Sequence, residues 1–221
     1  MQDSLTLIRT SDGSHTLKSE LFQQHYHSLH GAIQESEHVF FKEGLLRYQH
    51  IRNLRILEVG FGTGLNALLA FKYNKERNSK TDYISYEAFP ISIEIAEKLE
   101  YGKWLGKDYD KTLLSMHTAP MGVTQMISEE FSLLKKQEDI LEGMDEEEVD
   151  IVFFDAFSPG SQPELWAVEV FSNLHACMKQ GGILTTYCSK GDVRRAMLMA
   201  GFKVEKCPGP PGKREMLRAI K

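Results

Sequence analysis

Three glycines alternate at positions 60, 62 and 64, between a β-rich run at residues 55–59 and a stretch with helical spacing at residues 65–75. Glycine lets the backbone turn sharply and approach a ligand closely, so the pattern predicts a ligand-binding turn between a strand and a helix. Such a unit is typical of a doubly wound α/β domain, which binds ligands at the carboxyl ends of its strands. The turn therefore predicts the fold class and the place of the site together.

The spacing of these glycines also indicates the kind of ligand. A dinucleotide-binding loop follows the pattern G-x-G-x-x-G, which would require a third glycine where this chain has Leu65. A nicotinamide dinucleotide brings a pyrophosphate to the helix N-terminus, whereas S-adenosylmethionine carries a cationic sulfonium and no phosphate. An acid two residues before the first glycine suits a cation, so we favour S-adenosylmethionine. The expected cofactor contacts in this loop are Glu58, Gly60, Phe61, Gly62, Thr63, Gly64 and Asn66.

Two further acids follow predicted strands. Glu87 ends the strand predicted at residues 83–86, where a carboxylate reaches the ribose hydroxyls of an adenosine lying across the strand ends. Asp155 follows residues 149–154, the most apolar run of the chain, as expected for the centre of a parallel sheet. We therefore expect Asp155 to be catalytic, with the alternative that it caps a turn before Ser158 and Pro159.

Strands and helices alternate along most of the chain, which predicts a Rossmann-like, doubly wound, mainly parallel sheet of seven strands. The last strand returns through a short loop and is expected to be antiparallel to its neighbour. Residues 1–50 are interpreted as an N-terminal extension that contains a hairpin and covers the substrate side, and residues 51–221 as the main domain. The other predicted helices span residues 91–104, 163–178 and 193–200, the other strands residues 183–187, 203–206 and 216–220, and an inserted hairpin residues 122–136.

The charge distribution bears on the partner. The chain has 26 basic and 31 acidic residues, a net charge of −5, which argues against nucleic acid at first. Residues 129–150, however, hold ten acids and two bases, so the remainder has a net charge of +3. The acidic run at residues 145–148 is expected to be a solvated loop.

The remaining composition predicts neither a metal site nor a membrane segment. The three cysteines lie far apart with no CxxC pair, and His25, His27 and His30 lack further ligands, so these histidines are expected on the surface or in turns. The N-terminus is polar and no apolar run is long enough to cross a bilayer, which predicts a cytoplasmic protein.

The ordered motifs resemble those of the MnmC family of tRNA wobble-uridine modification enzymes, over the methyltransferase part, from about Tyr26 to the C-terminus. Asp-x-Phe-x-Pro, Pro-x-x-Trp and the terminal Lys-Arg-Glu-Met carry the resemblance more specifically than the glycine loop does. The matching segments are residues 58–66, 87–90, 155–159, 163–166, 189–195, 200–202 and 212–216.

This resemblance implies a reaction. The family methylates the exocyclic amine of 5-aminomethyl(-2-thio)uridine at the tRNA wobble position with S-adenosyl-L-methionine, giving the 5-methylaminomethyl form. Bifunctional members add an FAD-dependent oxidase domain, for which this chain has no room before Lys221, so we expect methylation alone, without FAD or metal. A separate oxidase or upstream modification enzyme would then supply the amine.

The resemblance also implies contacts, with two departures from the family pattern. The family's adenine-contacting Gly-Asp corresponds to Glu138 and Asp139, and its Asp-Gly-Phe has Ala156 in the middle. Asp139 is expected to bind adenine, Asp155 to orient the amine and collect a proton, and Phe157 to stack on uracil or to be a core residue. The remaining candidate contacts to the tRNA anticodon stem-loop are Tyr26, Glu35 and Ser36 for the nucleoside and Arg194, Lys213 and Arg214, with Arg195 and Arg218, for phosphates.

Two other functions stay open on the sequence alone. One is a methyltransferase or aminopropyltransferase that acts on a small-molecule amine. The other is a catalytically silent tRNA-binding protein that keeps the fold, against which the retained glycines and acids argue.

Overall fold

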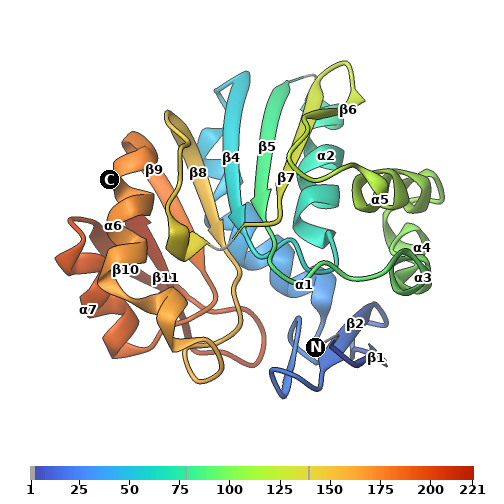
Figure 1. Cartoon of the computed structure of the whole chain (residues 1–221), viewed down its shortest axis with the longest axis horizontal. Helices are drawn as coiled ribbons and strands as arrows, with labels where there is room; N and C mark the ends of the chain where they lie inside the picture. The colour runs from blue at the N-terminus through green and yellow to red at the C-terminus, as the bar shows by residue number, and fades with distance from the viewer. Residues whose placement is uncertain (1–2, 78, 139) are drawn as a thin grey trace.

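The computed structural model describes residues 3–77, 79–138 and 140–221, and an eight-stranded mixed sheet forms its centre (Figure 1). The strand order is β10-β11-β9-β8-β4-β5-β7-β6. The strands of this sheet are β4 (Asn53–Val59), β5 (Lys80–Tyr86), β6 (Gln125–Ser128), β7 (Phe131–Lys136), β8 (Val149–Phe154), β9 (Met178–Thr186), β10 (Lys203–Pro208) and β11 (Glu215–Ile220).

The five middle strands are parallel and position the site. The glycine turn follows β4, which pairs with β5 on one side and β8 on the other. Every residue of β8 is buried, which confirms it as the central strand expected from its apolar sequence. The chain proceeds outward from β4 through β5 to β7 and then returns to β8, so the strand order reverses beside β4 and opens a crevice there. The last strand, β11, is antiparallel to both β9 and β10, as predicted.

The predicted hairpin at residues 122–136 is confirmed by the antiparallel pairing of β6 with β7, but its description as an insertion was wrong. β7 belongs to the main sheet and runs parallel to β5, with Leu133 opposite Tyr83, and only β6 is added as an antiparallel edge strand. The sheet consequently has one strand more than the seven expected. Phe131, Leu133 and Lys135 are buried in alternation, the period of two that a half-buried strand requires.

Helices cover both faces of the sheet (Figure 1). α2 (Leu65–Arg77) and α5 (Asp108–Thr118) pack with Ile56 and Phe153, whereas α6 (Val168–Cys177) and α7 (Gly191–Met199) pack with Leu57 and Phe154. Alternate residues of β4 and β8 thus serve opposite layers. No helix in the described parts of the chain is long and apolar enough to span a membrane.

Two helix predictions were wrong in detail. The region predicted as one helix at residues 91–104 forms α3 (Ile93–Ala96), a 3-10 turn η3 (Glu97–Leu99) and α4 (Gly102–Leu105), because Glu100 adopts a left-handed conformation that ends the first helix. α5 was not predicted at all. The region 163–178 is divided into η5 (Pro163–Trp166) and α6 by the extended residue Ala167. A further 3-10 turn, η4, spans Ile140–Glu142.

The N-terminal residues form a small sheet that lies at one end of the large one (blue in Figure 1). β1 (Leu5–Arg9) pairs with β2 (His15–Ser19), which confirms the predicted hairpin, and β3 (Gln24–His25) adds to β2. α1 (Ala32–Ser36), the π-helix η1 (Glu37–Lys42) and the 3-10 turn η2 (Leu45–Tyr48) follow. Phe40 is fully buried with its ring centroid 5.2 Å from that of Phe153, so part of this segment fills the main core, and the boundary at residue 50 stays a prediction.

The acidic run at residues 145–148 is not simply a solvated loop. Glu146 is buried, accepts a hydrogen bond from the Tyr86 hydroxyl and lies 2.6 Å, oxygen to nitrogen, from the Lys136 ammonium. Asp145 is exposed and pairs with the same lysine. The acids of this run therefore fasten a loop to the ends of β5 and β7.

Candidate active site

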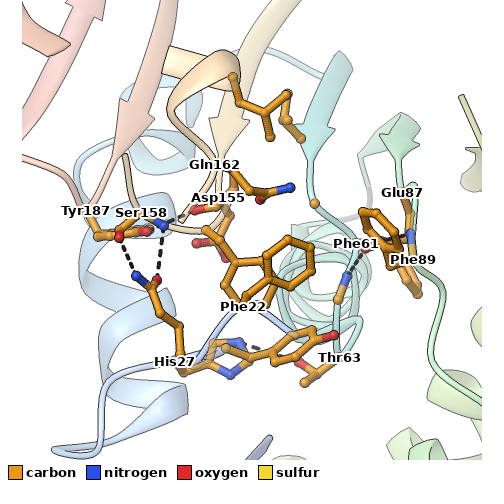
Figure 2. A pocket seen from close by; sticks show the side chains of 18 of the residues that line it. Phe22, His27, Phe61, Thr63, Glu87, Phe89, Asp155, Ser158, Gln162 and Tyr187 are labelled. Carbon is orange, nitrogen blue, oxygen red and sulfur yellow. Dashed lines mark hydrogen bonds between the residues drawn. The ribbon is translucent and has the colours of Figure 1, made fainter. Parts of the chain in front are cut away.

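A cavity of about 540 Å³ lies between the carboxyl ends of β4, β5 and β8 and the N-terminal segment (Figure 2). Most of the residues singled out in the sequence converge on it from widely separated parts of the chain. Those that line the cavity are Tyr26, Glu35, Gly60, Phe61, Gly62, Thr63, Asn66, Glu87, Asp155, Phe157 and Lys213.

The glycine turn has the conformation that its sequence predicts. Gly60 and Gly62 have φ angles of 92° and 50°, a left-handed region that favours glycine. A Cβ on Gly60 would lie 2.8 Å from the Asp155 carbonyl oxygen, and one on Gly62 would lie 3.0 Å from the Tyr26 ring. The turn is thus packed directly against the two segments that carry the catalytic and substrate candidates. Gly64 does not line the cavity; its carbonyl accepts a hydrogen bond from the Leu68 amide at the start of α2.

Glu87 joins the end of β5 to this turn. Its carboxylate accepts hydrogen bonds of 2.7 Å from the backbone amides of Gly62 and Phe89. Burial raises the pKa of Glu87, while these amides stabilise its charged form. Because a carboxylate can accept about four hydrogen bonds, acceptor capacity remains for a ligand in the cavity.

Two histidines brace Thr63 in the turn, of which His27 is buried and His117 is half-buried. Nε2 of His117, from α5, lies 3.1 Å from the Thr63 carbonyl oxygen, and Nε2 of His27 lies 3.4 Å from the Thr63 hydroxyl. Burial lowers the pKa of each histidine to about 4, so both rings are neutral at pH 7. His27 lies in a bend, as one of the two expected alternatives had it, but it is buried rather than on the surface, and its ring contacts the glycine turn. His25 is half-buried and His30 is exposed.

Glu58 and Asn66 lie below and beside the turn. Glu58 is fully buried, accepts a 2.8 Å hydrogen bond from the Ser85 hydroxyl and does not line the cavity. Burial holds the pKa of its carboxyl well above the usual range. Its contact with a cofactor stays a prediction. Asn66 lines the cavity, and its Oδ1 is a buried acceptor without a hydrogen-bond partner among the described residues, the kind of atom that a bound ligand can satisfy.

Asp155 stands at the end of β8 and faces the cavity. Its amide donates a 3.0 Å hydrogen bond to the Val59 carbonyl, and the Asn66 side-chain amide donates a 2.8 Å hydrogen bond to its carboxylate. Burial, together with the nearby negative charge of Glu35, raises the pKa of Asp155 to about 7. A carboxyl with this pKa can take up or release a proton near neutrality.

The N-terminal segment is fastened over Asp155 by hydrogen bonds and ring contacts. The Gln24 amide donates to the Ser158 hydroxyl, and the Ser158 amide donates a 3.1 Å hydrogen bond to the Gln24 side-chain oxygen. The Phe22 ring stacks on Phe157 with centroids 4.5 Å apart and meets Phe89 edge-on at 5.3 Å. Figure 2 shows Phe22 between Asp155 on one side and Glu87 with Phe89 on the other. Phe157 lines the cavity and also belongs to this aromatic cluster, so its stacking on a base stays a prediction.

The predicted phosphate contacts do not form one group. Lys213 points into the cavity, where its ammonium lies 2.8 Å from the Glu35 carboxylate. Arg194 is half-buried and Arg214 exposed, and both lie outside the cavity. Arg195 and Arg218 form ion pairs with acids of this chain. Ser36 is fully buried and does not line the cavity. The predicted adenine contact Asp139 lies outside the described residues.

Sequence reasoning missed several lining residues, among them Tyr187, Phe22 and Gln24. Tyr187 follows β9 at the same edge of the sheet as Glu87 and Asp155, and this position after a strand was a usable signal. Its hydroxyl donates a 2.9 Å hydrogen bond to the Ala156 carbonyl. Phe22 and Gln24 had no such signal, because their roles depend on contacts with residues more than 130 positions away.

The ionisable side chains give the cavity its chemical character. Besides histidines and tyrosines, the described lining contains one ammonium and five carboxyl groups: Lys213, Glu35, Glu87, Glu138, Asp155 and Glu164. Such a lining favours cationic ligands and disfavours a pyrophosphate. Within the described residues, no three His, Cys, Asp or Glu side chains are grouped as a metal site would require.

Comparison with known proteins agrees with this geometry. The model of a family described as S-adenosyl-L-methionine-dependent methyltransferase matches residues 107–221. The bifunctional tRNA 5-methylaminomethyl-2-thiouridine biosynthesis protein MnmC of Aromatoleum aromaticum is 32% identical over 98% of this chain and 35% of its own length. The protein of the same name from Leptospira interrogans is 34% identical over 90% of this chain and 33% of its own. The chain thus spans about a third of the length of these relatives.

One solved structure gives the same family, and a second shares the fold. MNMC2 from Aquifex aeolicus superposes with a TM-score of 0.80 at 30% identity, covering 99% of this chain and 71% of that one. Spermidine synthase from Thermotoga maritima superposes with a TM-score of 0.59 at 12% identity, covering 99% and 69%. The second likeness concerns the fold alone.

Proposed function

The chain belongs to the MnmC-type family of S-adenosyl-L-methionine-dependent methyltransferases, and from this premise we propose that it methylates the exocyclic amine of 5-aminomethyl(-2-thio)uridine at the wobble position of tRNA. The product is the 5-methylaminomethyl nucleoside. The observation that carries the proposal is the acidic cavity of about 540 Å³ at the strand ends, which Asp155 faces, since both proposed ligands are cationic in water.

The residues present fit the cofactor. The positive φ angles of Gly60 and Gly62 expose backbone at the cavity wall, and the unsatisfied Asn66 oxygen lies beside it. The remaining acceptor capacity of Glu87 suits ribose hydroxyls. Ile140 lines the region after β7 where adenine is expected, next to the predicted contact Asp139. When bound, the cofactor supplies a methyl group on a positively charged sulfur.

Asp155 has the properties needed to orient the amine. A simple alkylamine has a pKa of about 10.4, so it enters mostly as an ammonium ion. The nucleophile must be the neutral amine, whose lone pair forms the new N–C bond while the C–S bond breaks and sulfur keeps the electron pair. The Asp155 carboxylate accepts an N–H of the amine and thereby aligns its lone pair. The entering ammonium ion must first lose one proton, which a carboxyl with a pKa of about 7 can take up and pass to solvent. Methyl transfer then gives the product as its ammonium ion.

The N-terminal segment serves the nucleoside side in this proposal. Tyr26, Glu35 and Phe157 line the part of the cavity next to Asp155, so a wobble nucleoside turned out of its stack would meet an aromatic cluster. Arg194 and Arg214 lie outside the cavity, where the flanking phosphates would pass. We place the reaction in the cytoplasm, with tRNA as partner and a separate enzyme as the source of the amine.

Two measurements test the proposal. Purified protein with S-adenosylmethionine should methylate an anticodon stem-loop that carries 5-aminomethyluridine, and leave the same stem-loop with uridine unmodified. Transfer RNA from a deletion strain should accumulate 5-aminomethyluridine. Methylation or aminopropylation of a free polyamine, with the aminomethyl stem-loop ignored, would instead favour a small-molecule enzyme, and no transfer to either would favour a silent tRNA-binding protein.

A further inference from the structure

Lys213 and Glu35 form an ion pair inside the cavity that the methyl transfer described above does not use. Lys213 precedes β11 and Glu35 belongs to α1, so 178 positions separate them in the sequence. Nζ of Lys213 lies 2.8 Å from Oε1 of Glu35, and both residues line the cavity with Asp155. The Glu35 side chain is only 9% exposed. Because the Lys213–Glu35 pair joins distant segments at the cavity wall, we ask what ligand it could bind.

The pair is held in place on both sides. The Ser28 amide donates a 2.7 Å hydrogen bond to the other oxygen of Glu35. Nζ of Lys213 lies 4.0 Å from the centroid of the Tyr187 ring, and its backbone amide donates a 2.9 Å hydrogen bond to the Pro210 carbonyl. These contacts fix the direction in which the ammonium and the carboxylate can meet a ligand.

Both groups have hydrogen-bonding capacity beyond their mutual bond. An ammonium has three donors, and a carboxylate has about four acceptor positions. Lys213 therefore presents a donor directly beside an acceptor of Glu35. The Watson–Crick edge of uracil has the complementary order, with the O4 acceptor next to the N3–H donor.

We propose that Lys213 and Glu35 select uracil by binding its O4 and N3–H, respectively. This proposal rests on the proposed function, because it takes the aminomethyl nucleoside as substrate. In that nucleoside the aminomethyl group is on C5, adjacent to the carbon that bears O4. When the amine binds at Asp155, O4 is therefore brought toward Lys213. Lys213 and Glu35 both interact electrostatically with the Asp155 carboxylate.

Cytosine would be rejected by the same pair. Its N4 amino group would place donors against the Lys213 ammonium, and its unprotonated N3 would face the Glu35 carboxylate. A matched pair of base-edge hydrogen bonds discriminates between bases by about tenfold to more than a hundredfold. The pair therefore predicts a uridine preference that does not depend on the amine.

The test compares two stem-loops, with 5-aminomethyluridine or 5-aminomethylcytidine at the wobble position. The ratio of their kcat/KM values should be about 100 or more for the wild type, and at least about tenfold lower for Glu35→Gln, whose amide can turn a donor toward cytosine N3. Lys213→Met should lower the ratio, and Lys213→Arg should restore much of it. Lys206→Met, which removes an ion pair with Glu215 outside the cavity, should leave the ratio unchanged.

The outcomes separate this proposal from the one on which it rests. If the wild type methylates the 5-aminomethyluridine and 5-aminomethylcytidine stem-loops equally well, base selection by this pair is refuted while the proposed function stands. If the wild type methylates neither, both fail. A pair that only tunes Asp155 would shift the pH profiles of both substrates together and leave their ratio intact in Glu35→Gln. Calorimetric cofactor binding in each variant shows whether its fold is intact.

Discussion

The two walls of the cavity are built in different ways. The cofactor wall is a continuous strand–turn–helix unit, β4, residues 60–64 and α2, to which Glu87 is tied by two backbone hydrogen bonds. The substrate wall is assembled from segments far apart in the chain, with Gln24 bonded to Ser158 and Glu35 paired with Lys213. The cofactor wall depends on local backbone geometry, and the substrate wall on side-chain contacts between distant segments.

This difference predicts different responses to mutation. Backbone geometry at a positive φ is set by the residue itself, so one substitution there removes it. A surface held by several hydrogen bonds and ring contacts loses each of them separately, at about 0.5–1.5 kcal/mol per bond. Substitutions in the cofactor wall should therefore act in an all-or-none manner, and those in the substrate wall in graded steps.

The largest effect is expected for Gly62→Val. The φ of 50° is strained for a β-branched residue, and its Cβ would lie 3.0 Å from the Tyr26 ring, so the turn and the substrate wall would both shift. We expect S-adenosylmethionine affinity measured by calorimetry to fall at least about 100-fold, equivalent to roughly 2.7 kcal/mol.

Gly160→Val is the matched control for this change. The nearest atom to a Cβ on Gly160 is the Ser158 hydroxyl at 3.6 Å, an ordinary contact, and the residue is exposed. Its cofactor affinity should stay within about twofold of the wild type. Equal losses in both variants would show that the turn has no special role in cofactor binding.

The second effect is on turnover alone. Asp155→Asn keeps the shape of the side chain and removes its charge, so cofactor affinity should remain near normal while kcat falls by about 100-fold or more. For the wild type, log kcat/KM should rise with pH through about 7, because the carboxylate form increases there. Asp192→Asn changes an exposed carboxylate outside the cavity and serves as the control. Unchanged turnover in Asp155→Asn would leave Asp155 as a turn residue.

Asp155→Asn should lower turnover but raise the stability of the folded protein. The folded protein binds the Asp155 proton up to a pKa of about 7, against the ordinary value of 3.8, so this group makes the wild type less stable as pH rises through that window. Asparagine does not ionise, so the variant does not lose this stability as pH rises. In thermal melts, Asp155→Asn should therefore gain stability relative to the wild type between pH 4 and pH 8.

The two walls also differ in how far the sequence predicted them. The alternating glycines, Glu87 and Asp155 have signals within ten residues of themselves, because strand ends and turns have local sequence requirements. The parallel order around β4 followed from the same alternation of strands and helices. The family resemblance supplied the functions of Phe157, Glu35 and Lys213 as candidates, but not their contacts.

What the sequence did not predict depends on tertiary packing. The joining of β7 to the main sheet is decided by its pairing with β5, which the hairpin pattern of residues 122–136 cannot reveal. His27 and His117 both contact Thr63, although one precedes it and the other follows it by many positions in the chain. The pairing of Arg195 and Arg218 with acids likewise could not be read from composition.

A third and smaller effect tests the two histidines that brace Thr63 in the cofactor wall. His27 and His117 have pKa values lowered by burial to about 4, from 6.5, so the stability they contribute is present above pH 6.5 and is lost as pH falls toward 4. The free energy of unfolding should decrease by roughly 2–3 kcal/mol per histidine over this range. His117→Gln should flatten the decrease in pH-dependent melts, whereas substitution of the exposed His50 should not. Equal slopes in the two variants would contradict a bracing role.

The smallest effect is expected outside both walls, at Arg194 and Arg214. Arg195 and Arg218 are already paired with acids of this chain, so binding a phosphate would require each to give up its ion pair. Among the described residues, Arg194 and Arg214 form no ion pair that a phosphate would have to replace. Each phosphate neutralised contributes about 0.7–0.9 to the slope of log K against log salt concentration.

Arg194→Gln with Arg214→Gln should therefore reduce that slope by about 1.4–1.8 and weaken tRNA binding several-fold at physiological salt. Cofactor affinity and the uridine-to-cytidine ratio should not change, because both arginines lie outside the cavity. Arg195→Gln is the matched control: its guanidinium is paired with Asp192, and we expect little change in either slope or affinity. If the double variant keeps the wild-type slope of log K against log salt concentration, the phosphates bind elsewhere on the surface. If its uridine-to-cytidine ratio changes, base selection extends beyond the Lys213–Glu35 pair.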